Sequence, residues 1–189
     1  MTWKRPFDVA SALVLLVVAS PVLAVAALAI RASMGAPVLY RQRRTGLRGQ
    51  PFTLLKLRTM TPSCGTDADR ITALGRRFRA TSIDELPQLW NVLRGDMSLV
   101  GPRPLLPEYL DRYTPEQARR HAVRPGLTGL AQVSGRNALG WAEKFELDVW
   151  YVDHASLALD LRILWRSARC VLGGRGVAAP GHATMPEFR

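Results

Sequence analysis

The sequence predicts a mainly helical fold with minor β structure, in which an N-terminal membrane helix precedes a compact body. Three observations predict it: residues 9–30 carry no charge, several later segments repeat apolar residues at helical spacing, and only residues 51–57 resemble a short strand. With 48% hydrophobic and 22% charged residues among 189, the composition is that of a folded protein and excludes a disordered polymer. We expect a membrane helix with its flanks at 1–36, a folded domain at 37–172 and a flexible tail at 173–189.

The uncharged segment 9–30 is long enough to reach across a bilayer, because a helix rises about 1.5 Å per residue and the segment would span about 33 Å. A cleaved signal peptide would end near Ala24 to Ala26, yet the apolar residues continue past that point into a strongly basic region. A soluble core helix of this length without a polar face is also poorly supported. We therefore favour membrane insertion.

Both flanks of this segment are basic, and this limits how it can insert. Lys4 and Arg5 precede it, and a basic stretch begins at Arg31, so retention of basic residues on the cytoplasmic side opposes transfer of either end. Ser20-Pro21 lies near the middle, where proline bends a helix and serine can bond the backbone groups so released. A re-entrant helix that turns at Ser20-Pro21 and returns to the cytoplasmic face satisfies both flanks. An ordinary span with a kink is the alternative.

Further helices are predicted in the body by apolar spacing and by capping residues. Ser82 is expected to open a helix with apolar positions at Ile83, Leu86, Leu89, Trp90 and Leu93. Thr114, Pro115 and Gln117 form a capping box at another helix start, and residues 141–151 read as a third helix. The segment 156–172 places leucines and a tryptophan opposite Arg162, Arg166 and Arg169. It is typical of an amphipathic helix in a membrane interface, or of an ordinary packed surface helix.

The net charge of +11, from 26 basic and 15 acidic residues, predicts an anionic partner: nucleic acid, an acidic membrane surface or a phosphorylated substrate. No acidic residue occurs between Asp8 and Asp67, so the basic excess lies near the membrane segment. The two cysteines, Cys64 and Cys170, have neither the spacing nor the histidine neighbours of a zinc site.

An acidic pair, Asp84 and Glu85, stands out within the basic region 76–103. One interpretation is a capping box from Ser82 to Glu85, with acids in the first turn of a helix. The other is a carboxylate that meets a phosphorylated substrate among arginines. Such a carboxylate can attack phosphorus as a nucleophile or bind magnesium, and the basic side chains would offset charge on the transferring group.

Six motifs occur together and in order: Lys4-Arg5 with Phe7-Asp8, Ser20-Pro21, KLRTM (56–60), DELPQ (84–88), SLVGPRP (98–104) and RPGLTG (124–129). In these motifs the chain closely resembles the bacterial sugar transferase family, the monotopic phosphoglycosyl transferases, over residues 4–166. The resemblance implies an enzyme at the cytoplasmic face of the bacterial inner membrane, with a re-entrant helix before a catalytic domain. Such an enzyme moves a sugar 1-phosphate from a nucleotide diphosphate sugar, usually a UDP-sugar, to a polyprenyl phosphate and releases UMP.

The resemblance also implies roles for individual residues. Asp84 corresponds to the nucleophile that forms a phosphosugar-aspartate intermediate, and Asp84 and Glu85 together correspond to the acidic pair beside Mg²⁺. Arg103 resembles the phosphate-contacting arginine of the family, and residues 126–129 and 132–137 resemble loops near the pocket. The remaining expected substrate contacts are Lys56, Arg58, Arg79 and Arg136.

The positive charge makes anionic membrane lipid an expected partner, and no nucleic acid is expected. The alternative is a membrane-tethered basic module that binds anionic lipid or nucleic acid without catalysis. A related alternative is a structural partner that keeps the fold but has lost activity, and the intact Asp84, Glu85 and Arg103 argue against it.

Overall fold

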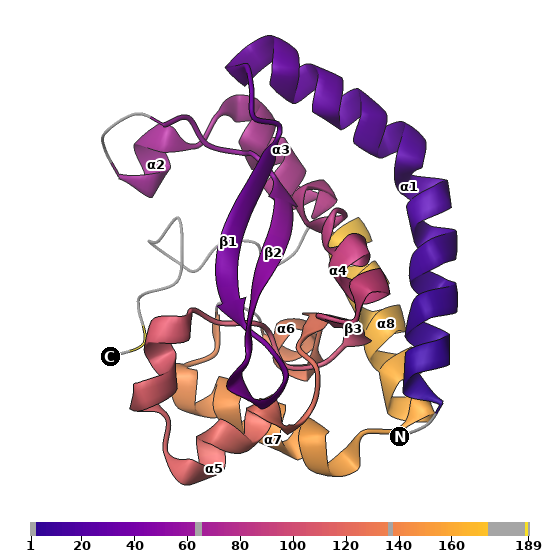
Figure 1. Cartoon of the computed structure of the whole chain (residues 1–189), viewed down its shortest axis with the longest axis vertical. Coiled ribbons are helices and arrows are strands. Elements are labelled where there is room, and N and C mark those ends of the chain that lie inside the picture. Colours follow the sequence, from indigo (N-terminus) through magenta and orange to yellow (C-terminus); the bar gives the residue numbers. More distant parts are fainter. Residues whose placement is uncertain (1–2, 63–65, 136–137, 174–187, 189) are drawn as a thin grey trace.

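The computed structural model describes residues 3–62, 66–135, 138–173 and 188, and it confirms the mainly helical fold class. Helix α1 runs along one side of a body of shorter helices and two small sheets (Figure 1). The predictions for Cys64, for Arg136 and for most of the tail lie outside the described residues.

The α-helices are α1 (Lys4–Met34), α2 (Asp67–Arg70), α3 (Ala73–Ala80), α4 (Gln88–Arg94), α5 (Pro115–Ala118), α6 (Leu130–Ser134), α7 (Trp141–His154) and α8 (Leu157–Leu172). The 3-10 helices are η1 (Leu47–Gly49), η2 (Ile83–Glu85), η3 (Pro107–Arg112) and η4 (Arg119–Ala122). The strands are β1 (Leu39–Thr45), β2 (Pro51–Leu57), β3 (Ser98–Val100) and β4 (Gly126–Thr128).

Helix α1 contains the Ser20-Pro21 pair and bends near its middle without ending there (Figure 1). Pro21 has no N–H to donate to the carbonyl of Val17 one turn earlier, and the Ser20 hydroxyl donates to that same oxygen at 2.8 Å. The predicted role of Ser20 as a local hydrogen-bond partner is thus confirmed. Among the described residues α1 is the one helix long and apolar enough to cross a membrane, and only 11% of its most apolar stretch is buried.

Strands β1 and β2 form an antiparallel hairpin that pairs Leu39 with Leu57 and Thr45 with Pro51. The strand predicted at 51–57 is confirmed. Leu54 packs into the main core, and Leu57 packs in a second cluster that includes residues from the C-terminal half of α1. The hairpin therefore joins the body to the end of the apolar helix.

The helix expected to open at Ser82 is not one continuous helix: η2 begins directly after Ser82 and ends at Glu85, and α4 begins at Gln88, so the prediction of a single helix is wrong. Ser82 has a left-handed backbone with φ 57°, and its side chain makes no capping hydrogen bond. Helix α4 starts only after Pro87, because a proline ring fits the first turn of a helix but not its interior. Within α4, Leu89 is buried as expected, but Trp90 is 53% exposed and does not belong to the core.

Polar contacts tie the first turns of α1 to the centre of the body. The parallel pair β3–β4 lies in the main core, and the buried Asp8 carboxylate accepts a hydrogen bond from the Leu99 amide of β3 at 3.0 Å. Lys4 forms an ion pair with the buried Asp160 of α8, which also accepts a hydrogen bond from the Tyr151 hydroxyl at 2.7 Å. These contacts therefore fix the N-terminal end of α1 to β3 and to α8.

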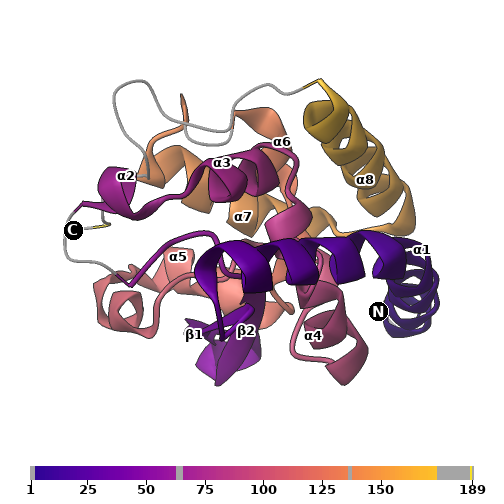
Figure 2. The ribbon, with the colours of Figure 1, turned by 90° about the horizontal axis from the view of Figure 1, so that it is seen from above.

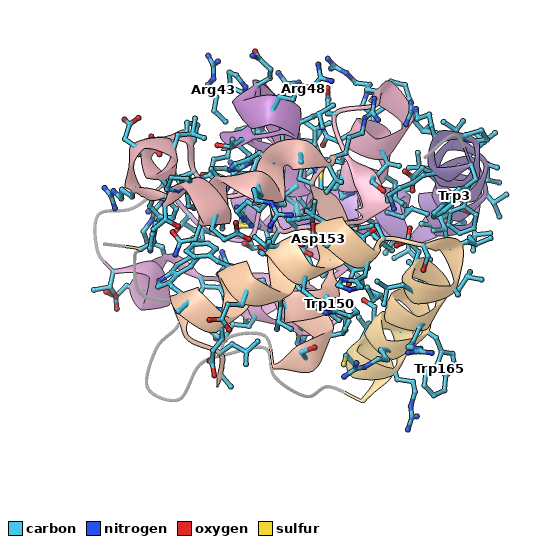
Figure 3. The ribbon with its side chains drawn as sticks, turned by 90° about the horizontal axis from the view of Figure 1, so that it is seen from below. Trp3, Arg43, Arg48, Trp150, Asp153 and Trp165 are labelled. Atoms are coloured by element: carbon cyan, nitrogen blue, oxygen red, sulfur yellow. The ribbon has the colours of Figure 1, made fainter. Side chains whose placement is uncertain are left out.

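The predicted helices at the C-terminal end of the body are confirmed, as is the Thr114 capping box. Figures 1 and 2 both show α8 beside the N-terminal half of α1. On α8, Asp160 and Ile163 are buried, whereas Leu157, Leu161 and Trp165 are 42%, 50% and 60% exposed. Trp165 projects away from the body (Figure 3). Leu157, Leu161 and Trp165 therefore form an outward apolar stripe on α8, whereas Leu164 packs against the main core.

Candidate active site

A cavity of about 2200 Å³ is lined by the β1–β2 hairpin, η2, the loop after β3, and α7. Residues of α1 and α8, among them Val14 and Leu164, add an apolar part to its wall. Among the described residues, the basic side chains of the lining are Arg44, Lys56, Arg58, Arg70, Arg76, Arg79, Arg103, Arg120 and Lys144, and the acidic ones are Asp84, Glu85 and Asp148. This excess of positive charge suits an anionic ligand.

Glu85 is held by two basic side chains from different parts of the chain. Its Oε1 atom accepts from Lys56 Nζ at 2.7 Å and from Arg103 Nη2 at 3.0 Å. Burial acts to raise the pKa of Glu85, but Lys56 and Arg103 outweigh burial and hold the pKa well below its usual range. Glu85 therefore stays ionised and fixes two of the expected substrate-binding residues beside its neighbour Asp84.

Asp84 is in the opposite situation. Its side chain is buried, with the residue 5% exposed, and across the described residues its carboxylate makes no hydrogen bond or ion pair. Burial raises the pKa of Asp84, and the nearby Lys56 charge counteracts the rise. Successive residues of a 3-10 helix point about 120° apart, so η2 turns Glu85 toward its cations and leaves Asp84 free at the cavity wall.

The capping-box interpretation of the acidic pair fails on geometry. Ser82 makes no side-chain capping bond, and α4 follows Pro87, which likewise provides none. The carboxylates of Asp84 and Glu85 are therefore not occupied with helix capping.

The structure places Arg79 and Arg58 on the cavity wall with different partners. Arg79 Nε donates to Thr59 Oγ1 at 3.1 Å. The Arg58 guanidinium binds carbonyl oxygens at the end of α1: those of Gly35 at 2.8 Å and Ala36 at 3.1 Å, together with that of Met34. Arg58 thus holds the C-terminal end of the apolar helix against β2.

The segment 126–129, expected as a loop, is mostly strand β4, and it lies at the cavity through Leu127 and Thr128 while its glycines serve close packing. A Cβ atom at Gly126 would lie 2.1 Å from the Gly101 nitrogen, and one at Gly129 would lie 2.2 Å from the Gly101 oxygen. Two of the sequence motifs therefore pack backbone to backbone, which only glycine allows. Gln132 lines the cavity as expected, and its Nε2 atom donates to the Leu127 carbonyl at 3.3 Å.

Sequence reasoning missed a buried ion pair, Arg120 with Asp148. Arg120 Nε and Nη2 donate to Asp148 Oδ2 at 3.1 and 2.6 Å. Arg120 Nη2 also donates to the backbone carbonyl of Arg103 at 2.7 Å, so the pair supports the arginine that contacts Glu85. The two partners are 28 positions apart on η4 and α7, and no local pattern indicates their contact.

An aromatic cluster forms another part of the wall and was also missed. It consists of Tyr109, Tyr113, Trp141, Phe145 and Phe188. The Phe188 ring lies 4.9 Å from that of Phe145 and 5.7 Å from that of Tyr109, centroid to centroid. Phe188 belongs to the tail predicted to be flexible, yet it packs in this cluster, three members of which line the cavity.

The acidic pair fits the ligand requirements of magnesium. In the described part of the chain, no three acidic, histidine or cysteine side chains lie together as a ready-made metal site. Magnesium usually takes one or two carboxylates from the protein and completes its shell with water and substrate phosphates. The free Asp84 carboxylate beside Glu85 suits such a site, provided that a bound substrate supplies phosphate oxygens.

Several known proteins are similar to this chain in sequence. The chain is 51% identical over 194 residues to the uncharacterized sugar transferase EpsL of Bacillus subtilis, covering 100% of this chain and 96% of that protein. It is 48% identical to the UDP-glucose:undecaprenyl-phosphate glucose-1-phosphate transferase of Caulobacter vibrioides, covering 89% of this chain and 69% of the relative. The undecaprenyl-phosphate galactose phosphotransferase of Salmonella typhimurium is 38% identical, and the match spans 89% of this chain but 40% of that longer protein.

The family model described as bacterial sugar transferase matches residues 1–174. The match takes in the apolar helix, the hairpin, the acidic pair and the loops that line the cavity. This chain therefore belongs to the bacterial sugar transferase family.

Proposed function

We propose that this protein transfers a sugar 1-phosphate from a UDP-sugar to a membrane polyprenyl phosphate, through a covalent intermediate on Asp84, and releases UMP. The observation that carries the proposal is the contrast within the acidic pair: Glu85 is neutralised by Lys56 and Arg103, whereas Asp84 is free at the wall of a basic cavity. The names of the Caulobacter and Salmonella relatives, both of which act on undecaprenyl phosphate, support the substrate classes.

The reaction takes two displacements at one phosphorus atom. In the first, an Asp84 carboxylate oxygen attacks the sugar-linked phosphorus of the donor, the bond from that phosphorus to the bridging oxygen breaks, and UMP leaves with the electron pair. In the second, an oxygen of the polyprenyl phosphate attacks the same phosphorus and Asp84 departs as a carboxylate. Neither step needs a general base when the attacking groups are ionised, and the nearby Lys56 charge favours the ionised form of Asp84 against the effect of burial.

The basic side chains of the cavity bind the diphosphate and stabilise charge as it shifts. Arg103 and Lys56, held by Glu85, are already in position for this role. Asp84 and Glu85 would hold magnesium, which when bound offsets the charge of the diphosphate.

The contacts of α1 favour the re-entrant topology, and its basic flanks favour a site at the cytoplasmic face of the inner membrane. Its first turns bind the body through Lys4 and Asp8, and its last residues bind β2 through Arg58. A folded body lies on one side of a membrane, so both ends of α1 belong on that side while the exposed apolar middle enters the lipid. The outward apolar stripe of α8 and its arginines suit contact with an anionic leaflet.

The test is Asp84→Asn in purified protein in lipid nanodiscs with magnesium. The substitution keeps the shape of the side chain, so the variant should fold and insert but lose nearly all UMP release and any protein-bound sugar phosphate. Wild type without lipid acceptor should release about one UMP per protein and then stop, whereas Glu85→Gln should react slowly yet still form the adduct. Asp111→Asn, at an exposed aspartate outside the cavity lining, should match wild type.

Three results would contradict the proposal. They are an Asp84→Asn protein that still traps sugar phosphate, full turnover in excess chelator, and continued UMP release without lipid. The first result would mean that another residue is the nucleophile. The second would mean that the reaction does not need magnesium, and the third that the lipid phosphate is not the acceptor. A protein that binds polyanions with strong salt dependence and releases no UMP would instead be the non-catalytic basic module.

A further inference from the structure

One face of the β1–β2 hairpin is directed into the cavity. Alternate residues of β1 share a face of the sheet, and Tyr40, Gln42 and Arg44 all line the cavity. Lys56 lies directly opposite Tyr40 on β2, and it too lines the cavity. Arg43 is exposed and projects into solvent (Figure 3). The basic run of β1 is therefore divided, with Arg44 facing the site and Arg43 facing away.

Arg44 has a charge that the described protein does not neutralise. Its Nη2 atom donates to the neutral Gln42 Oε1 at 2.7 Å, and its Nε atom is buried with no hydrogen-bond partner among the described residues. No carboxylate in the described ranges forms an ion pair with it, and its strongest charged neighbour is the like charge of Arg103. Burial, followed by that repulsion, lowers the pKa of Arg44. A half-buried guanidinium without a counter-ion is costly unless an anion joins it.

We propose that Arg44 binds a phosphate group of the substrate, so that the Tyr40, Gln42 and Arg44 face of the hairpin forms a wall of the binding site beside Arg103. The inference rests on the proposed function, because that reaction supplies phosphate from two sources, the nucleotide diphosphate and the lipid. Arginine suits the role, since its planar fork can donate two parallel hydrogen bonds to phosphate oxygens. The unused Nε donor and the Nη2 atom held by Gln42 lie on one edge of such a fork.

The test compares Arg44→Gln with Arg43→Gln, an adjacent substitution of the same charge change on the opposite face of the strand. Binding of UDP is measured with magnesium and without lipid, and the KM values for the UDP-sugar and the polyprenyl phosphate are measured separately. We expect Arg44→Gln to weaken UDP binding or raise one KM at least tenfold, which is about 1.4 kcal/mol. Arg43→Gln should stay within about twofold of wild type, which sets the size of a non-specific charge effect.

The arms of the experiment identify the source of the phosphate. Loss of UDP binding assigns Arg44 to the donor, and a raised KM for the lipid alone assigns it to the acceptor. Wild-type values in every arm overturn the inference, as does an equal loss in Arg43→Gln. If Arg44→Gln does not fold, Arg44→Met fills a similar space without charge and takes its place. A wild type that binds UDP but releases no UMP would refute the proposed reaction while leaving the binding comparison intact.

Discussion

Asp148→Asn isolates the contribution of the buried ion pair that supports Arg103. Asp148 and Arg120 are both buried, and Asp148 Oδ2 accepts two hydrogen bonds from the guanidinium at 3.1 and 2.6 Å. The asparagine is nearly the same size, but it leaves the Arg120 charge without its partner. Removing one member of a buried pair costs about 3–5 kcal/mol of folding stability. For a chain of this size, each kcal/mol lowers Tm by about 2–4 °C, so Tm should fall by about 6–20 °C.

The same substitution should lower activity at temperatures where the variant remains folded. Arg120 Nη2 donates to the Arg103 carbonyl at 2.7 Å, and Arg103 in turn contacts Glu85 at 3.0 Å. Loss of the Asp148 anchor frees Arg120 to move, and the Arg103 side chain is then less well placed for the donor. Thermal unfolding gives the stability change, and initial rates of UMP release, at a temperature below both midpoints, give the activity change.

Two comparisons separate this role from a general loss of structure. Asp153 lies on α7, as Asp148 does, and forms an exposed ion pair with Arg119 of η4. Asp153→Asn removes this pair and should cost less than about 1 kcal/mol of folding stability and leave UMP release unchanged. If Asp148 acts through Arg103, Asp148→Asn should cause little further loss of activity in an Arg103→Ala background. Equal Tm values for the two asparagine variants would refute the stability reasoning. Fully additive activity losses would refute the link to Arg103.

Two other outcomes follow from the described contacts. Burial and then the Arg120 charge lower the pKa of His121 to about 4 from its ordinary 6.5, so the unfolded chain takes up this proton first as pH falls. Between pH 6.5 and 4 stability should therefore decrease, by about 2 kcal/mol after allowance for solvent screening, and His121→Gln should flatten that part of the curve of Tm against pH. Pro21→Ala should straighten α1 and favour full crossing. In a cysteine-free background, a cysteine placed at Thr2 should be labelled from outside intact cells in Pro21→Ala but not with native Pro21, and labelling with native Pro21 would exclude the re-entrant helix.

Short sequence patterns predicted the parts of the fold that depend on contacts between residues close in the sequence. Thr114 caps its helix because the capping box needs only residues three apart, and Ser156 likewise accepts from the Leu159 amide at 3.3 Å. Ser20 and the Val17 carbonyl are also within one turn of each other. At Ser82 the local pattern was misleading, because Pro87 prevents one continuous helix and the polypeptide turns through a left-handed residue instead.

The acidic pair was predictable from the sequence. It was not predictable that two basic side chains bind Glu85 while the Asp84 carboxylate has no such partner among the described residues. That difference depends on Lys56, which is 29 positions from Glu85, and on Arg103, which reaches Glu85 from the loop after β3. The Arg120 and Asp148 contact and the inward direction of Arg44 also depend on how distant elements meet. Composition indicated a basic protein with an anionic ligand, and the folded chain then determines which of those charges lie at the cavity.

The position of the apolar helix and the chemistry of the site depend on two residues at the end of β2 and just after it. Lys56, the penultimate residue of β2, binds Glu85, and Arg58, two positions later, binds the carbonyl oxygens at the end of α1. At the other end of α1, Asp8 binds the amide of Leu99, which lies four residues before Arg103. The two cations that hold Glu85 are therefore each connected, within a few residues, to an end of the apolar helix. Under the proposed function, insertion of the apolar middle of α1 in the membrane would set the height of Asp84 above the lipid surface, where a phosphate on a lipid chain could reach it.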